Sequence, residues 1–198
     1  LMDRVKDQSK RKLFEDKLKS SILKLDDLLI ALLEMVDVQK NNQQVYEDLD
    51  LKATFDFIAA DLQEELLEIN ADVRVDFSAA PTLNFNKAQL RSLFQNLLTN
   101  SVKYRDLDRP LSVFVNSERI GDYVVLHFSD NGMGIDLERH GKDLFKPFKR
   151  LSNQGEGKGI GLNLVKGFVD RNGGEIKVES EKGIGTTFHI FIKSILAD

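Results

Sequence analysis

The stretch Asn96-Leu97-Leu98-Thr99-Asn100-Ser101-Val102-Lys103-Tyr104 carries the strongest indication of the fold. In a helix, Asn96, Asn100 and Lys103 share one stripe, because residues at i, i+4 and i+7 return to nearly the same angle. Asn86 can cap the start of this helix, with Gln89 at the capping-box position three residues later. On this stretch alone, an ordinary core helix with a solvated polar face is the competing interpretation. The adjacent apolar stripe, typical of a helix packed on a core, comprises Leu90, Leu93, Phe94, Leu97, Leu98 and Val102.

A second polar feature follows a predicted strand at residues 122–129 and reads Ser129-Asp130-Asn131-Gly132-Met133-Gly134-Ile135. Asp130 has the parity of the core-facing residues of that strand. A buried carboxylate is costly unless something donates to it. The motif is either a turn-forming Asp-Asn-Gly or an acceptor for a ligand's donor. In the second case, Gly132 and Gly134 let a flat ligand approach the backbone.

Residues 136–158 form a long connection with little periodicity, and basic side chains prevail from Lys142 to Lys158. Long connections inside compact domains are usually functional, so we expect a lid over an anion. The following glycine-rich run, residues 155–161, leads into an apolar helix. Its backbone N–H groups and the helix dipole offer a phosphate cradle. The run matches neither the dinucleotide fingerprint nor a P-loop.

The remaining pattern places strands and helices in blocks, which favours an α+β fold: a two-layer sandwich with helices on one face of a mixed sheet. A helix capped by Thr54 is predicted to reach about Ile69, and the helix after the glycine run is predicted to end at Gly173-Gly174. The predicted strands are residues 45–51, 73–78, 111–116, 122–129, 175–180 and 186–193, with a short alternating segment at Leu83 and Phe85.

The amino-terminal part repeats apolar residues alternately every four and three positions from residue 13 to about 40. This is the seam of a coiled coil or helical bundle. Such a helix must pack on the following domain, on an upstream helix or on another chain. The polar run at residues 40–44 reads as a linker, so we predict domains at residues 1–40 and 41–198.

Composition bounds the remaining possibilities. The chain has 198 residues, 41% of them hydrophobic and 30% charged, and no run long enough to span a membrane. The absence of cysteine excludes disulfides and thiolate metal sites and fits a reducing compartment, so a cytoplasmic location is expected. A net charge of −4 without a basic aromatic patch argues against nucleic-acid binding.

Five motifs in order resemble the catalytic ATP-binding domain of sensor histidine kinases, which has the Bergerat fold of the GHKL group. The resemblance covers roughly residues 45–195, and the sequence around Phe148-Lys149-Arg150-Leu151 is most similar to that of phytochrome-type kinases. The motifs are an N box at Asn96–Tyr104, a first glycine box at Asp130–Gly134, a phenylalanine box at Phe145–Phe148, a second glycine box at Gly157–Gly161 and a third at Gly183–Thr187.

The resemblance implies a phosphate end for the site. Asn100 would hold Mg²⁺ through its amide oxygen, and such an ion typically keeps several waters and bridges substrate phosphates. Asn96 and Lys103 would lie near the phosphates. Arg150 would reach the terminal phosphate from the lid and stabilise the charge of phosphoryl transfer. The implied catalytic residues are therefore Asn96, Lys103 and Arg150.

It also implies an adenine end. Tyr104 would lie against the adenine, Asp130 would accept its amino group, and Thr187 would close that side. The remaining residues implied to bind ATP are Gly132, Gly134, Gly157, Gly159, Gly161 and Leu162.

Related hydrolases such as gyrase carry a glutamate four residues before the Mg²⁺ asparagine, as general base for water. Here that position is Asn96, which cannot take a proton, so transfer to a protein nucleophile is favoured. The family implies a phosphoacceptor histidine on a helix preceding the heptad helix, a homodimer through that hairpin and a response regulator as partner. No histidine precedes His127, so we expect no autophosphorylation at the usual site. A nucleotide-binding scaffold and an anti-sigma-type serine kinase remain alternatives.

Overall fold

The computed structural model describes residues 45–149 and 159–194. These residues belong to one compact unit. The predicted heptad helix at residues 13–40, the linker after it, Arg150 and Gly157 lie outside the described residues. The domain boundary and the dimerisation hairpin therefore stay predictions. In the described part of the chain, no helix is long and apolar enough to cross a membrane.

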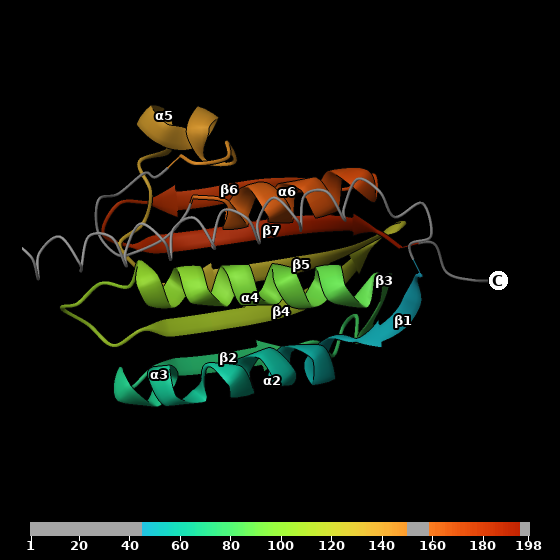
Figure 1. The fold of residues 1–198 in the computed structure, drawn as a ribbon, viewed down its shortest axis with the longest axis horizontal. Helices are drawn as coiled ribbons and strands as arrows, with labels where there is room; N and C mark the ends of the chain where they lie inside the picture. Colours follow the sequence, from blue (N-terminus) through green and yellow to red (C-terminus); the bar gives the residue numbers. More distant parts are fainter. Residues whose placement is uncertain (1–44, 150–158, 195–198) are drawn as a thin grey trace, which may run out of the picture. The chain divides into compact units, whose positions relative to one another are not determined.

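A five-stranded mixed sheet forms one layer, in the order β2-β4-β5-β7-β6 (Figure 1). The β2–β4 pair is parallel and the other three pairs are antiparallel. A separate antiparallel pair joins β1 and β3. The strands are β1 (Glu47–Asp50), β2 (Asp72–Asp76), β3 (Thr82–Phe85), β4 (Ser112–Ile120), β5 (Tyr123–Asp130), β6 (Glu175–Glu181) and β7 (Gly185–Lys193).

The second layer consists of helices that cover one face of this sheet (Figure 1). The predicted two-layer α+β sandwich is thus confirmed. The central helix α4 packs between α2 and α6. The helices are α2 (Leu51–Asp61), α3 (Gln63–Glu68), α4 (Lys87–Lys103), α5 (Leu137–His140) and α6 (Gly161–Arg171), with a 3₁₀ turn, η1, at Gly141–Asp143.

Helix α4 begins where its sequence predicts. The side chain of Asn86 accepts a hydrogen bond from the Gln89 backbone N–H at 3.0 Å, which satisfies one of the orphan donors of the first turn. Its whole predicted apolar stripe is at most 2% exposed. Phe94 lies edge to face against Phe55 of α2, with ring centroids 5.3 Å apart. This packing fixes the helix on the sheet and so positions its polar stripe.

The two faces of β5 differ in character. Its even-numbered residues from Val124 to Asp130 point toward the helices, as predicted, and Val124, Leu126 and Phe128 are buried. On the opposite face, the Nδ1 atoms of His127 and His189 lie 2.7 Å apart, and His127 Nε2 lies 2.9 Å from a carboxylate oxygen of Glu118. Both histidines sit in strands, away from the helical layer.

Two predicted boundaries were wrong. Asp50, not Thr54, caps α2, since its carboxylate accepts from the Ala53 N–H at 2.8 Å; Thr54 instead donates to the Asp50 carbonyl from inside the first turn. The predicted single helix breaks at Leu62 into α2 and α3. The connection after residue 136 also contains local structure, because α5 and η1 occupy residues 137–143.

Candidate functional site

Asp130 ends the core-facing row of β5, and both oxygens of its carboxylate have protein donors. Oδ1 accepts from the Gly132 backbone N–H at 2.9 Å, and Oδ2 accepts from the Ser101 hydroxyl at 3.0 Å. Burial raises the pKa of Asp130 above its usual value, although hydrogen bonds from Gly132, Ser101 and the Thr186 backbone act in the opposite direction. A partly desolvated acceptor therefore faces α4.

Gly132 lies directly against the end of α4. The Met133 N–H donates to the Tyr104 carbonyl at 2.9 Å. A Cβ atom on Gly132 would lie 2.7 Å from the same carbonyl oxygen, so a side chain does not fit there. Gly134 has φ +66° and its missing Cβ would overlap the Glu181 backbone. Both glycines are required for the loop after β5 to pass this closely between α4 and β6.

The polar stripe of α4 meets the start of α6. Asn96 donates from Nδ2 to the Ser92 carbonyl at 2.8 Å, and its Oδ1 occupies the space that a Cβ on Gly161 would need. Within residues 45–149 and 159–194, the amide of Asn100 makes no hydrogen bond. Lys103 Nζ lies 4.8 Å from the centroid of the Tyr104 ring. The four predicted residues of α4 and its cap are thus brought together, and the side-chain amide of Asn100 has no hydrogen bond to the described residues.

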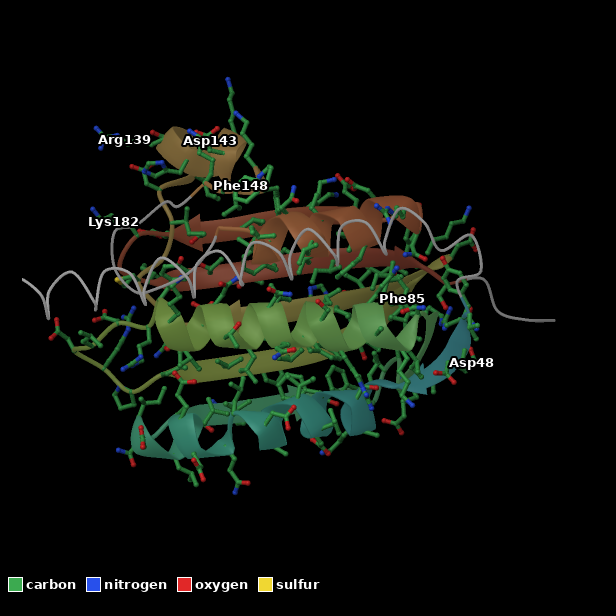
Figure 2. All side chains as sticks on the ribbon, in the orientation of Figure 1. Asp48, Phe85, Arg139, Asp143, Phe148 and Lys182 are labelled. Carbon is green, nitrogen blue, oxygen red and sulfur yellow. The ribbon has the colours of Figure 1, made fainter. Side chains whose placement is uncertain are left out.

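The described ends of the predicted lid are tied to each other. The Phe148 N–H donates to the Gly159 carbonyl at 2.8 Å, and Gly159 has φ +68° with Lys149 backbone in the place of its Cβ. Asn163 of α6 donates to the Phe145 carbonyl at 2.9 Å. Figure 2 labels Phe148 of this lid and Arg139 and Asp143 of the α5 and η1 segment before it. The two hydrogen bonds join the base of the lid to the amino-terminal end of α6.

Helix α6 begins at Gly161, and the backbone N–H groups of its first turn have no intrahelical acceptors, as in any helix. Ile160 supplies no side-chain cap there. Leu162 follows within the first turn and is half-buried. These N–H groups and the positive end of the helix dipole make the start of α6, beside Asn96, suited to a phosphate.

Thr187, which was expected to close the adenine side, lies on the opposite face of the sheet from the other predicted residues. It is opposite Ser129 in the ladder and shares a 2.9 Å hydrogen bond with the Ser129 hydroxyl, on the face of the sheet away from the helices. Thr186 is the register partner of Asp130 and is only 6% exposed. Because side chains alternate along a strand, the neighbouring threonine takes the inner position.

Three further site residues were missed by the sequence interpretation. Thr186 could have been found from its parity with Phe188 and Ile190 of β7, which are buried. Ser101 lies within the N-box stretch, but only its distance to Asp130 reveals a partner. Arg109 lies in the polar loop between α4 and β4, where no sequence pattern distinguishes it as a site residue.

The donor set has a definite chemical character. It combines a half-buried carboxylate, an amide without a hydrogen bond to the described residues, a lysine and an N-terminal helix end, which suits an amino-bearing base linked to phosphates. Among the described residues, no group of three or more histidine or acidic side chains could hold a metal ion.

Comparison with known proteins agrees with this geometry. The profile of the family described as "Histidine kinase-, DNA gyrase B-, and HSP90-like ATPase" matches residues 85–195. Cyanobacterial phytochrome A of Nostoc sp. is 32% identical over 170 residues, which are 85% of this chain and 21% of that protein. The chain thus spans about a fifth of the length of this curated relative.

Solved structures share the fold. Full-length ShkA in complex with AMPPNP matches with a TM-score of 0.74 and 20% identity, over 88% of this chain and 36% of ShkA. Histidine kinase ThkA in complex with the response regulator protein TrrA matches with a TM-score of 0.67 and 18% identity, over 87% of this chain and 48% of that one. The chain belongs to the histidine kinase-, gyrase B- and HSP90-like ATPase family and contains the ATP-binding catalytic domain of a sensor histidine kinase.

Proposed function

We propose that this chain transfers the γ-phosphoryl group of ATP to a histidine on a dimerisation domain, for relay to a response regulator. The observation that carries the proposal is the Asp130 carboxylate, half-buried at the inner end of β5 and oriented by Ser101 and Gly132. It faces the helix that presents Asn96 and Asn100. The acceptor for an amino group and the residues that would lie near the phosphates would thus form one site.

The adenine would lie at the Asp130 end. Asp130 would accept its exocyclic amino group, and Tyr104 would lie against its ring. Thr186, beside Asp130 on the inner face, would close this side in place of Thr187. Gly132 and Gly134 would let the base approach the backbone.

The phosphates would lie between α4 and the start of α6. Lys103 and the backbone of Gly159, Gly161 and Leu162 would bind them, together with Gly157 and Arg150. Mg²⁺, when bound, would neutralise developing charge on the phosphate oxygens. The Asn100 amide oxygen would hold it, which fits an amide with no other hydrogen bond in the described part of the chain.

Transfer is favoured over hydrolysis by the chemistry of Asn96. Its Nδ2 is engaged by the Ser92 carbonyl, and neither amide atom can act as a base for water near neutral pH. The site lacks a carboxylate at this position. It would therefore position ATP for attack by a nucleophile delivered on another domain.

The partners follow from the same proposal. The heptad pattern of residues 13–40 supports a homodimer through a helical hairpin. A response regulator would receive the phosphoryl group, as the ThkA complex with TrrA illustrates for that protein. Such a relay would operate in the cytoplasm.

The test uses a version of the protein that includes the histidine-bearing helix implied by the family, with γ-labelled ATP. We expect acid-labile, base-stable phosphate on the protein, and none for Asn100→Ala. Acid-stable label would favour the serine kinase, and ATP binding without any label would favour a scaffold. Unchanged transfer in Asn100→Ala would refute the assignment of the metal ligand.

A further inference from the structure

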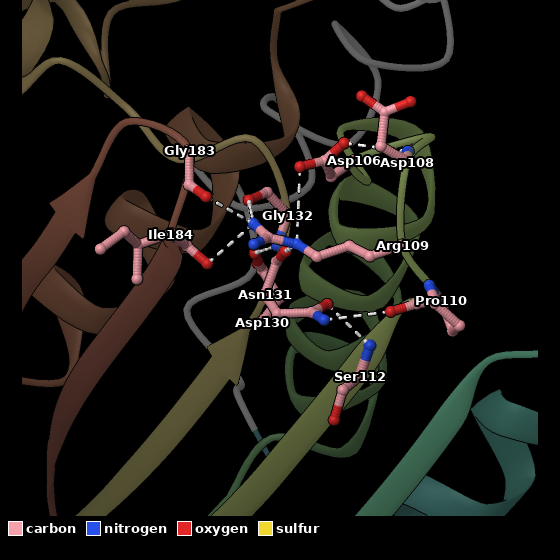
Figure 3. A network of polar contacts seen from close by, with 10 residues as sticks. All are labelled: Asp106, Asp108, Arg109, Pro110, Ser112, Asp130, Asn131, Gly132, Gly183 and Ile184. Atoms are coloured by element: carbon pink, nitrogen blue, oxygen red, sulfur yellow. Dashed lines mark hydrogen bonds and ion pairs between the residues drawn. The ribbon is translucent and has the colours of Figure 1, made fainter.

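Arg109, in the loop between α4 and β4, donates to two segments that are distant from it in the sequence (Figure 3). Its Nε donates to the Asn131 carbonyl at 2.9 Å, and one terminal nitrogen donates to the Gly132 carbonyl at 3.0 Å. The same terminal nitrogen reaches the carbonyls of Gly183 at 2.8 Å and Ile184 at 3.1 Å. One guanidinium therefore joins the loop after β5 to the turn between β6 and β7.

One of these carbonyls belongs to the peptide group that holds the Asp130 carboxylate, and a second belongs to the peptide that follows it. In the peptide between Asn131 and Gly132, the oxygen accepts from Arg109 while the N–H donates to Asp130 Oδ1 at 2.9 Å. In the next peptide, the Gly132 oxygen accepts from Arg109 while the Met133 N–H donates to Tyr104. Arg109 thus fixes the planes of two consecutive peptides, and the first of them orients the carboxylate.

The loop that carries Arg109 is itself anchored to the same segment. The Asn131 side chain accepts from the Ser112 N–H at 2.7 Å and donates to the Pro110 carbonyl at 3.0 Å. A carboxylate oxygen of Asp106 lies 3.5 Å from Arg109 Nε. The guanidinium is therefore pre-oriented, which lowers the entropy lost in holding four carbonyls.

We infer that Arg109 is a positioning residue for nucleotide recognition: it acts through the peptide groups of Asn131 and Gly132 to aim the Asp130 carboxylate at the adenine amino group. This inference rests on the proposed function for its ligand. Within residues 45–149 and 159–194, Arg109 donates its hydrogen bonds to backbone carbonyls, so its effect would reach the ligand through these peptide groups. Because residue 132 is a glycine, these peptide groups can rotate once the hydrogen bonds from Arg109 are removed.

Arg109→Ala tests the inference, with Arg105→Ala as the matched control. Arg105 lies in the same loop, and its one hydrogen bond to the described residues goes to the Val102 carbonyl of α4, at 2.8 Å. In Arg109→Ala we expect the ATP dissociation constant to rise about tenfold, the effect of one charge-assisted hydrogen bond. Discrimination between ATP and ITP, which lacks the amino group, should fall in parallel. Neither should change in Arg105→Ala.

A second readout needs no nucleotide. The Gly132 N–H lowers the pKa of Asp130, so its loss should move the NMR carboxyl titration of Asp130 to higher pH in ligand-free Arg109→Ala. Arg109→Lys keeps the positive charge but loses the planar guanidinium with its several donors, so it should shift the Asp130 titration less than Arg109→Ala does. An unshifted titration in folded Arg109→Ala would overturn the inference. If the alanine variant unfolds, an unshifted titration in Arg109→Lys would do so.

The two readouts separate the inference from the proposed function. A wild-type protein that binds no ATP would refute the proposed function, while the carboxyl titration would still test the positioning role of Arg109. If the wild-type protein binds ATP, and Arg109→Ala changes neither the ATP affinity nor the Asp130 titration, only the positioning role of Arg109 would be refuted.

Discussion

Replacing Asp130 by asparagine separates the ligand-binding role of this carboxylate from its structural role. The new side chain would keep an oxygen for the Gly132 N–H, now 2.9 Å from Asp130 Oδ1. Its amide nitrogen would face the Ser101 hydroxyl, now 3.0 Å from Oδ2, and that hydroxyl can accept. The hydrogen bonds with Gly132 and Ser101 therefore survive Asp130→Asn, whereas the half-buried negative charge does not.

Two opposite effects follow from this change. The desolvation of Asp130 disappears, so the free energy of unfolding at neutral pH should be unchanged or higher. The adenine amino group loses a charged acceptor, which costs about 1.5 to 3 kcal/mol. This corresponds to a roughly tenfold to hundredfold rise in the ATP dissociation constant.

Isothermal titration calorimetry with Mg²⁺-ATP and urea unfolding measure the two effects on one preparation. Asp76→Asn is the control, because Asp76 is exposed at the end of β2 and bonds only its own turn, at the Ser78 N–H. Unchanged ATP affinity in Asp130→Asn would refute the role of the carboxylate. A large loss of stability with intact affinity would show that Asp130 serves the fold.

Three further perturbations test other parts of the account. Gly161→Ala places a Cβ against the Asn96 amide oxygen and should weaken ATP binding with little change in urea midpoint; equal affinity would contradict the close contact. Phe94→Ala should cost about 3 to 5 kcal/mol of unfolding free energy, since Phe94 is 0% exposed; a loss below about 1 kcal/mol would argue against its packing. Burial raises the pKa of Asp130, so its contribution to stability is greatest below the unfolded pKa and is lost as pH rises through the folded one. Relative to Asp130→Asn, the wild-type protein should therefore gain stability and lose ATP affinity on acidification, as denaturant melts and titrations across about pH 4 to 7 would show; parallel profiles would contradict this.

Much of the layer architecture could be predicted because its signals are local. The period and cap of α4 are carried by consecutive residues, and the periodicity agrees with the burial of its stripe. The start of α2 was misplaced because Asp50 both ends a strand and caps the helix; a cap a few residues later fitted the pattern equally well. Local signals therefore predict the existence of an element better than its first residue.

The site was predicted less completely, because its geometry depends on register. To choose between Thr186 and Thr187, one must know which residues of β7 face the helices. The alternation along this strand gives the answer once Phe188 is assigned to the core. The roles of Ser101 and Arg109 arise from contacts across 29 and up to 75 residues of sequence. No local pattern carries that information.

The most direct test of the account is an NMR titration of the protein with Mg²⁺-AMPPNP, followed by side-chain signals. If ATP binds between α4 and the inner end of β5, we expect saturable shifts for the Asn100 amide, the Asp130 carboxyl and the Thr186 methyl, with little change for the Thr187 methyl on the opposite face. Shifts centred on Thr187 and His127, or no saturable shift at Asp130, would contradict the placement of ATP between α4 and the inner end of β5.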